Sequence, residues 1–157
     1  MKLTPLLPFA FIALSTPCLA EDTSRAEIQT VVDRFQAAIK AHDGAALGQM
    51  FLPGSTAWIT ALGPGALRNV REKHPEAPPY KQGTWQAFAA YVSQASEPIE
   101  ERFHNVRINT DGTVASVYFD FEFVAAGKVD NRGAETWQML RTPDGWKIVA
   151  MLYSSNL

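Results

Sequence analysis

Apolar residues recur at helical spacing in the first part of the chain. Their offsets of 3, 4, 7 and 11 positions place them on one face of an amphipathic helix, which we predict over residues 24–41. Ser24 followed by Glu27 is a capping box at the start of this helix, and Asp43-Gly44 ends it. The residues of the apolar face are Ile28, Val31, Val32, Phe35 and Ile39.

Two shorter helices are predicted before residue 98. One ends before Pro53, and the other begins at its N-cap Thr84 and ends before Pro98. Between them, residues 53–79 are rich in proline and glycine and contain one strand-like run, residues 56–62. So long a loop-rich segment in a compact domain is typical of a lid or a binding loop.

The last third of the chain alternates apolar and polar positions, which is typical of β-strands. Asp111-Gly112 and Pro143-Asp144-Gly145 have the composition of tight turns, and Gly127 and Asn131 mark a further connection. We therefore predict an antiparallel meander. Its strands cover residues 100–109, 113–124, 134–141 and 146–155.

The second of these strands has two different faces. We interpret its apolar face as core beneath the helices, and its polar face as solvent-exposed, with a dimer contact or a polar cavity wall as alternatives. The apolar face consists of Ala115, Val117, Phe119, Phe121 and Phe123, and the polar face of Ser116, Tyr118, Asp120 and Glu122.

Helices followed by a meander predict an α+β fold. Two segments resemble the nuclear-transport-factor-2-like superfamily, which includes SnoaL-like cyclases and ketosteroid isomerase: VVDRFQAAIKAHDGAALGQMF (31–51) and GAETWQMLRTPDGWKIVAMLYSS (133–155). The resemblance covers residues 25–155. It implies a cystatin-like roll, in which a cone-shaped, curved antiparallel sheet packs against about three N-terminal helices.

Residues 1–20 have the pattern of a secretory signal peptide. Lys2 precedes a short apolar run, residues 6–14, and Cys18-Leu19-Ala20 fits a cleavage site before Glu21. The run is shorter than the roughly 20 apolar residues of a transmembrane helix. We therefore predict one periplasmic or secreted domain over residues 21–157, with acylation of Cys18 as the alternative fate of the leader.

Composition excludes several classes of function. Among 157 residues, 14 basic against 16 acidic side chains give a net charge of −2, so nucleic acid and, once the leader is removed, membranes are not expected partners. The single cysteine lies in the leader, which excludes disulfides and thiol chemistry from the mature domain. No metal-ligand spacing is present, and Gly63-Pro64-Gly65 is interpreted as a turn, so neither a metal nor another cofactor is predicted.

The resemblance to ketosteroid isomerase can be followed residue by residue. The position of its hydrogen-bonding tyrosine on the first helix is Phe35 here, and the position of its general base falls within residues 55–60, which contain no carboxyl group. The position of its protonated aspartic acid falls near Glu135. One carboxyl group cannot both abstract a proton and stabilise the product, so the resemblance does not imply steroid isomerisation.

Glu135 is nevertheless the leading candidate for a site residue. It lies between Gly133 and Trp137, where an aromatic wall can keep a carboxyl group protonated or a cation such as Arg102 can pair with it. An exposed strand glutamate is the alternative. His104 is the histidine expected to face the interior of the cone, so Glu135 and His104 form a candidate acid–base pair.

Three functions are compatible with these patterns. The first is binding of a small, mostly apolar molecule in the cone, although the same aromatic residues can serve only as core. The second is an isomerase, cyclase or dehydratase that uses Glu135 and His104, and the third is an assembly module that forms a homodimer through its sheet face. Candidate ligand-binding residues are Trp58, Tyr80, Trp85, Arg102, Tyr118 and Trp137.

Overall fold

A six-stranded sheet and four helices are formed by residues 17–55 and 57–156, the part of the chain that the computed structural model describes. The predicted leader lies mostly outside these residues. The helices are α1 (Pro17–Lys40), α2 (Gly44–Gly48), α3 (Pro64–Lys73) and α4 (Trp85–Gln94). The strands are β1 (Ala57–Leu62), β2 (Tyr80–Gln82), β3 (Ile99–Thr110), β4 (Val114–Ala125), β5 (Lys128–Thr142) and β6 (Gly145–Ser155).

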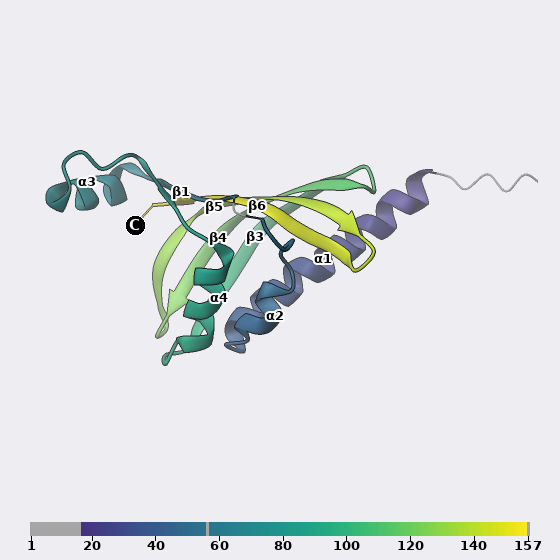
Figure 1. Cartoon of the computed structure of the whole chain (residues 1–157), viewed down its shortest axis with the longest axis horizontal. Coiled ribbons are helices and arrows are strands. Elements are labelled where there is room, and N and C mark those ends of the chain that lie inside the picture. The colour runs from purple at the N-terminus through teal and green to yellow at the C-terminus, as the bar shows by residue number, and fades with distance from the viewer. Residues whose placement is uncertain (1–16, 56, 157) are drawn as a thin grey trace, which may run out of the picture.

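The strands follow the order β2-β1-β6-β5-β4-β3. Neighbours pair antiparallel, as predicted for β3 to β6, but β1 pairs with β6 in parallel, so the sheet is mixed. The sheet curves over α1, α2 and α4, whereas α3 projects beyond one end of it (Figure 1). The predicted α+β fold is therefore confirmed, and none of the described helices is long and apolar enough to span a membrane.

The core lies between the helices and the concave face of the sheet. Phe35 of α1 packs against rings from three other elements, with its centroid 4.8 Å from that of Trp137 and 5.9 Å from that of Phe103. The predicted apolar face of β4 is buried throughout, from Ala115 to Phe123. The period-two alternation of β4 therefore identified the inner face correctly.

Helix α1 begins earlier than its capping box predicts. Ser24 lies inside the helix and is buried, where its Oγ accepts a hydrogen bond of 3.3 Å from Arg141. Glu27 accepts hydrogen bonds from Arg141 and, at 3.1 Å, from the indole nitrogen of Trp146. The two residues thus join α1 to β5 and β6, because helical backbone over residues 17–23 leaves no N-cap at Ser24.

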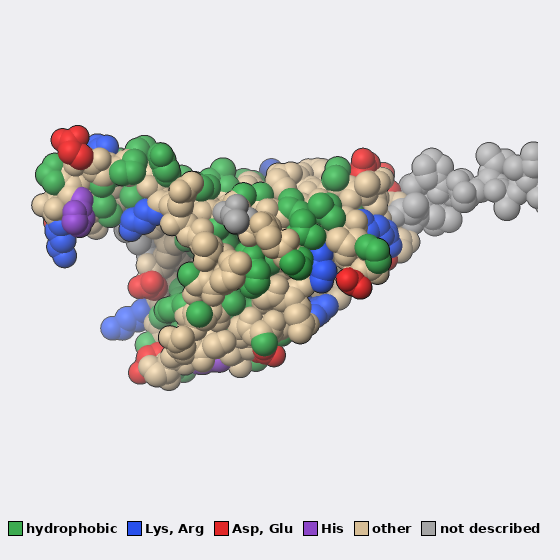
Figure 2. Space-filling view, viewed as in Figure 1, with side chains coloured by type: hydrophobic (Ala, Val, Ile, Leu, Met, Phe, Trp, Pro, Cys, Tyr) green, Lys and Arg blue, Asp and Glu red, His purple; other side chains and the backbone are tan. Residues whose placement is uncertain are grey.

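The segment 53–79 is more regular than its composition predicts. Gly63-Pro64-Gly65 is not a turn: it opens α3, with Pro64 at a first-turn position where a missing N–H costs no hydrogen bond. Figure 2 shows this end of the molecule projecting from the body with side chains of both charges. The connection expected at Gly127 and Asn131 is also shorter, since β5 already begins at Lys128.

Candidate functional site

A cavity of about 280 Å³ lies between α1, α4 and the concave face of the sheet. Most of its wall is aromatic, and its polar groups are mainly carboxyl groups. The aromatic residues are Phe35, Trp58, Phe88, Tyr91, Phe121, Phe123 and Tyr153, and the acidic residues are Glu101, Asp130 and Glu135.

The aromatic residues form a nearly continuous wall of rings. The centroid of Trp58 lies 5.2 Å from that of Phe88 and 6.1 Å from that of Tyr153. Tyr153 in turn lies 5.8 Å from Phe121, and Phe88 lies 6.4 Å from Phe123. These separations are typical of packed aromatic pairs, so the rings stabilise one another and hold the wall in shape.

Glu135 lies on the inner face of β5 and is only 3% exposed. The indole nitrogen of Trp137 donates a hydrogen bond of 2.5 Å to its Oε1. Burial raises the pKa of Glu135 to about 8, and the hydrogen bond from Trp137 opposes part of that rise. With a pKa of about 8 the carboxyl group is largely protonated at neutral pH, so it can donate a hydrogen bond to a bound molecule.

Gly133 allows the backbone next to Glu135 to approach β6 closely. A Cβ atom at this position would lie 2.1 Å from the carbonyl oxygen of Ser154, which no side chain tolerates. The sequence GAETW therefore combines a close strand contact with the site carboxyl two residues later.

Glu101 is a second candidate site residue, which the sequence pattern did not predict. It lies on the inner face of β3, lines the same cavity as Glu135 and is 7% exposed. Burial raises its pKa well above the ordinary value, and the nearby charge of Glu135 raises it further. Ile99 and Phe103, two residues away on either side, share its face and provided the signal that could have identified it.

The expectation that His104 faces the interior is wrong. His104 is exposed on the outer face of the sheet, opposite Asp120, so it cannot act with Glu135 on one substrate. The prediction failed because β3 contains a β-bulge between His104 and Arg107, where Asn105 has a φ of 54°. The bulge inverts the alternation of inward and outward positions along β3.

Three predicted ligand-binding residues also lie away from the cavity. Arg102 is on the outer face, where it pairs with Glu100 rather than with Glu135. Tyr118 is 39% exposed on the same outer face, beneath the guanidinium of Arg107, and Tyr80 is 51% exposed on β2. The prediction of a dimer through the outer face stays a prediction.

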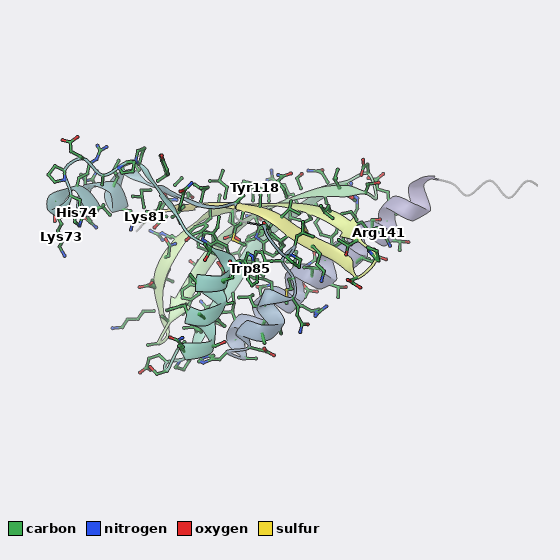
Figure 3. All side chains as sticks on the ribbon, viewed as in Figure 1. Lys73, His74, Lys81, Trp85, Tyr118 and Arg141 are labelled. Atoms are coloured by element: carbon green, nitrogen blue, oxygen red, sulfur yellow. The ribbon has the colours of Figure 1, made fainter. Side chains whose placement is uncertain are left out.

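The three predicted tryptophans have three different positions. Trp58 lines the cavity, and Trp137 is fully buried behind Glu135. Trp85 instead stacks on Phe51, with ring centroids 5.5 Å apart, and its buried indole nitrogen has no hydrogen-bond partner in the described part of the chain. Figure 3 shows Trp85 beneath the sheet at the start of α4, with Tyr118 on the opposite side of the sheet.

Metal-binding chemistry has no support among the described side chains. Among the side chains that the structure describes, those of residues 21–55 and 57–156, no three histidine, cysteine, aspartate or glutamate residues gather as metal ligands. The functional groups that line the cavity are two buried carboxyl groups and an aromatic wall.

Comparison with solved structures identifies the fold. One similar structure is a candidate dehydratase of the nuclear-transport-factor-2-like family from Streptomyces avermitilis, with 20% identity, coverage of 87% of this chain and 98% of that chain, and a TM-score of 0.62. A candidate scytalone dehydratase from Novosphingobium aromaticivorans shares 9% identity, with 89% of each chain covered and a TM-score of 0.63. A nuclear-transport-factor-2-like protein with a cystatin-like fold, also from N. aromaticivorans, shares 15% identity over 88% of this chain and 85% of that chain, with a TM-score of 0.61.

The comparisons with family models and curated proteins gave no match at a significant level. The structural similarity therefore establishes the nuclear-transport-factor-2-like, cystatin-like fold that the sequence predicts. It does not establish an activity, because this fold carries many unrelated sites.

Proposed function

Within this fold, we propose that the cavity binds a small, mostly apolar organic molecule whose polar group is recognised by Glu101 and Glu135. The observation that carries the proposal is the enclosure of two buried carboxyl groups by an aromatic wall. Ligand sites are usually lined by apolar side chains and contain a few polar groups that orient the ligand. The same combination is unfavourable if the cavity serves only as core, since none of the described residues that line it is a cation that could pair with either carboxyl group.

The size of the cavity limits the ligand. Ligand pockets commonly measure roughly 300–1,000 Å³, and this cavity of about 280 Å³ lies just below that range. A molecule with one or two rings fits such a volume. Its apolar part would contact Trp58, Phe88 and Phe123, while a carbonyl or hydroxyl oxygen would accept a hydrogen bond from a protonated carboxyl group.

Replacing Trp58 is expected to abolish much of this binding. Trp58→Leu keeps an apolar side chain but removes one ring of the wall, so we expect affinity for the best ligand of an aromatic panel to fall at least tenfold. Native mass spectrometry and tryptophan fluorescence would measure the change. Tyr80→Leu is the matched control, because Tyr80 is an exposed ring outside the cavity.

Equal losses in the Trp58 and Tyr80 variants would contradict the assignment of the cavity as the binding site. Circular dichroism must show that each variant is folded, since Trp58 also packs against Phe51 and Phe88. If no ligand from the panel binds the unmodified protein, the proposal itself is wrong.

A second candidate function is acid–base catalysis by Glu101 and Glu135. The specific observation is that the two carboxyl groups line one cavity and that the charge of one raises the pKa of the other. One group therefore remains protonated when the other has ionised, which supplies an acid and a base. A pKa of about 8 for Glu135 also lies close to neutral pH, where proton transfer is most efficient.

Catalysis would be detected as hydrogen exchange at carbon. We expect the protein to exchange the protons next to the carbonyl group of a small aryl ketone in D₂O, measured by NMR. Glu135→Gln and Glu101→Gln should each reduce the rate by about 100-fold or more, because each variant loses one proton-transfer group. Glu72→Gln on the exposed surface of α3 should have no effect, and equal rates in all variants would exclude the two carboxyl groups.

We also propose that the protein acts outside the cytoplasm. The support is the leader pattern of residues 1–20, and the expected result is a mature protein that begins at Glu21. Cell fractionation of a Gram-negative host followed by intact mass spectrometry would measure this. An uncleaved cytoplasmic protein would contradict the proposal, and a lipid adduct on Cys18 would show the alternative processing.

A further inference from the structure

We infer that the ligand of the cavity is an organic cation, specifically a small amine or ammonium group attached to an aromatic or aliphatic body. This inference rests on the proposed binding function and specifies its ligand class. The observations behind it are the acidic side chains of the cavity, the aromatic rings around them and, among the described residues, the absence of a lysine, arginine or histidine from its lining.

The ionisable side chains that line the cavity are all acids, so any charge that they carry is negative. Glu101, Glu135 and Asp130 line it, whereas no lysine, arginine or histidine does so among the residues that the structure describes. The nearest candidates by sequence, Arg102 and His104, lie on the outer face of the sheet. A ligand that carries a positive charge would therefore supply the missing counter-charge.

Burying two carboxyl groups without a cation beside them is unfavourable in free energy. A buried acid without a partner loses its hydration, and removing the charge by protonation recovers only part of that loss. Glu135 has one hydrogen bond, from Trp137 to Oε1, which leaves its second oxygen for another donor. An ammonium group donates up to three hydrogen bonds and could satisfy both glutamates at once.

The aromatic wall favours the same ligand. The faces of aromatic rings carry partial negative charge and attract cations that lie within about 6 Å of the ring centroid. Trp58, Phe88 and Tyr153 form part of a continuous set of rings around the acids, with adjacent centroids 5.2 to 6.1 Å apart. A carboxylate ligand would meet the partial negative charge of the ring faces and, once a glutamate has ionised, the charge of that glutamate.

Binding of a cation should also release protons. The titratable groups that face the glutamates are Asp130 on β5, Tyr153 on β6 and Tyr91 on α4, while α1 contributes only Phe35. None of these groups is positively charged, so the bound ammonium would be the cation that favours ionisation of Glu135. We expect close to one proton to be released per amine bound at pH 7.

The test compares three probes of similar shape and different charge. These are 2-phenylethylamine, which is protonated at neutral pH, 2-phenylethanol and 3-phenylpropanoate. Isothermal titration calorimetry in two buffers of different ionisation enthalpy would measure affinity and proton release. We expect the amine to bind at least tenfold more tightly than the alcohol, and the carboxylate to bind more weakly than either.

Variants separate this inference from the underlying binding function. Glu101→Gln and Glu135→Gln should each reduce affinity for the amine at least tenfold and leave affinity for the alcohol nearly unchanged, while Trp58→Leu should weaken both. If the alcohol binds as tightly as the amine, or the glutamine variants retain the preference, the inference is wrong and the binding proposal stands. If none of the three probes binds, both are wrong.

Discussion

Replacing Glu135 by glutamine is expected to stabilise the protein by several kcal/mol at pH 8.5. The unfolded chain releases the proton of this residue near its ordinary pKa of 4.5, whereas the folded protein retains it up to about pH 8. Between these values the folded state binds more protons, so raising the pH favours unfolding. The stabilising contribution is complete below about pH 4.5 and is lost as the pH rises through 8.

The expected slope is roughly 1.4 kcal/mol per pH unit in the free energy of unfolding across that window. Urea denaturation of the protein and of Glu135→Gln at pH 5, 6.5, 8 and 8.5 would measure it. Glutamine keeps an oxygen that can accept the hydrogen bond from Trp137, so the variant isolates the charge. Glu72→Gln, on an exposed turn of α3, should preserve the original slope.

A pH-independent difference between the unmodified protein and Glu135→Gln would contradict the protonated state of Glu135. Glu101 contributes to the same slope, because its pKa is also raised by burial and by the charge of Glu135. The double variant should therefore show the flattest dependence on pH. An increase in the slope after either substitution would contradict the electrostatic coupling of the pair.

Phe35→Ala is expected to lower the free energy of unfolding by about 3–5 kcal/mol. Phe35 is 1% exposed and packs against Phe51, Phe88, Phe103 and Trp137. Removing its ring loses burial energy and opens a void, because α1 and the sheet cannot close fully around an alanine. Denaturant unfolding monitored by circular dichroism would measure the loss.

Tyr91→Ala is the matched control for this prediction. Tyr91 also lines the cavity and lies near Phe88 and Phe123, but it is 47% exposed. The expected loss is about 1 kcal/mol, because less apolar surface returns to water. Similar losses in the two variants would contradict the assignment of Phe35 to the centre of the core.

The helices and strands that the sequence predicted well are those with a strong local period. The alternation of β4 identified its buried face, and Thr84 caps α4 through a hydrogen bond of 3.1 Å from Ala87. Helix α3 was missed because proline and glycine at its start have the same composition as a turn. Local patterns therefore predict an element correctly when a residue type is typical of one kind of structure. They fail when the same residues, such as proline and glycine, are typical of both a turn and the start of a helix.

The sequence predicted one of the two buried carboxyl groups of the site. Glu135 was identified because Gly133 and Trp137 flank it on a strand of clear alternation. Glu101 was missed and His104 was chosen instead, because a bulge at Asn105 inverts the alternation along β3. The pattern of residues along β3 does not predict that bulge, because the bulge depends on how β3 pairs with β4.

The sequence by itself determined the order of the main helices and strands, the inner face of β4 and the candidate carboxyl group of Glu135, because each depends on neighbours close along the chain. Only the tertiary structure decided that Glu101 joins Glu135 and that Arg102 and His104 turn outward. The two glutamates are distant in sequence and line one cavity only because β3, β4 and β5 are neighbours in a curved sheet (Figure 1). That pairing depends on the register and curvature of the sheet, which are properties of the packed molecule.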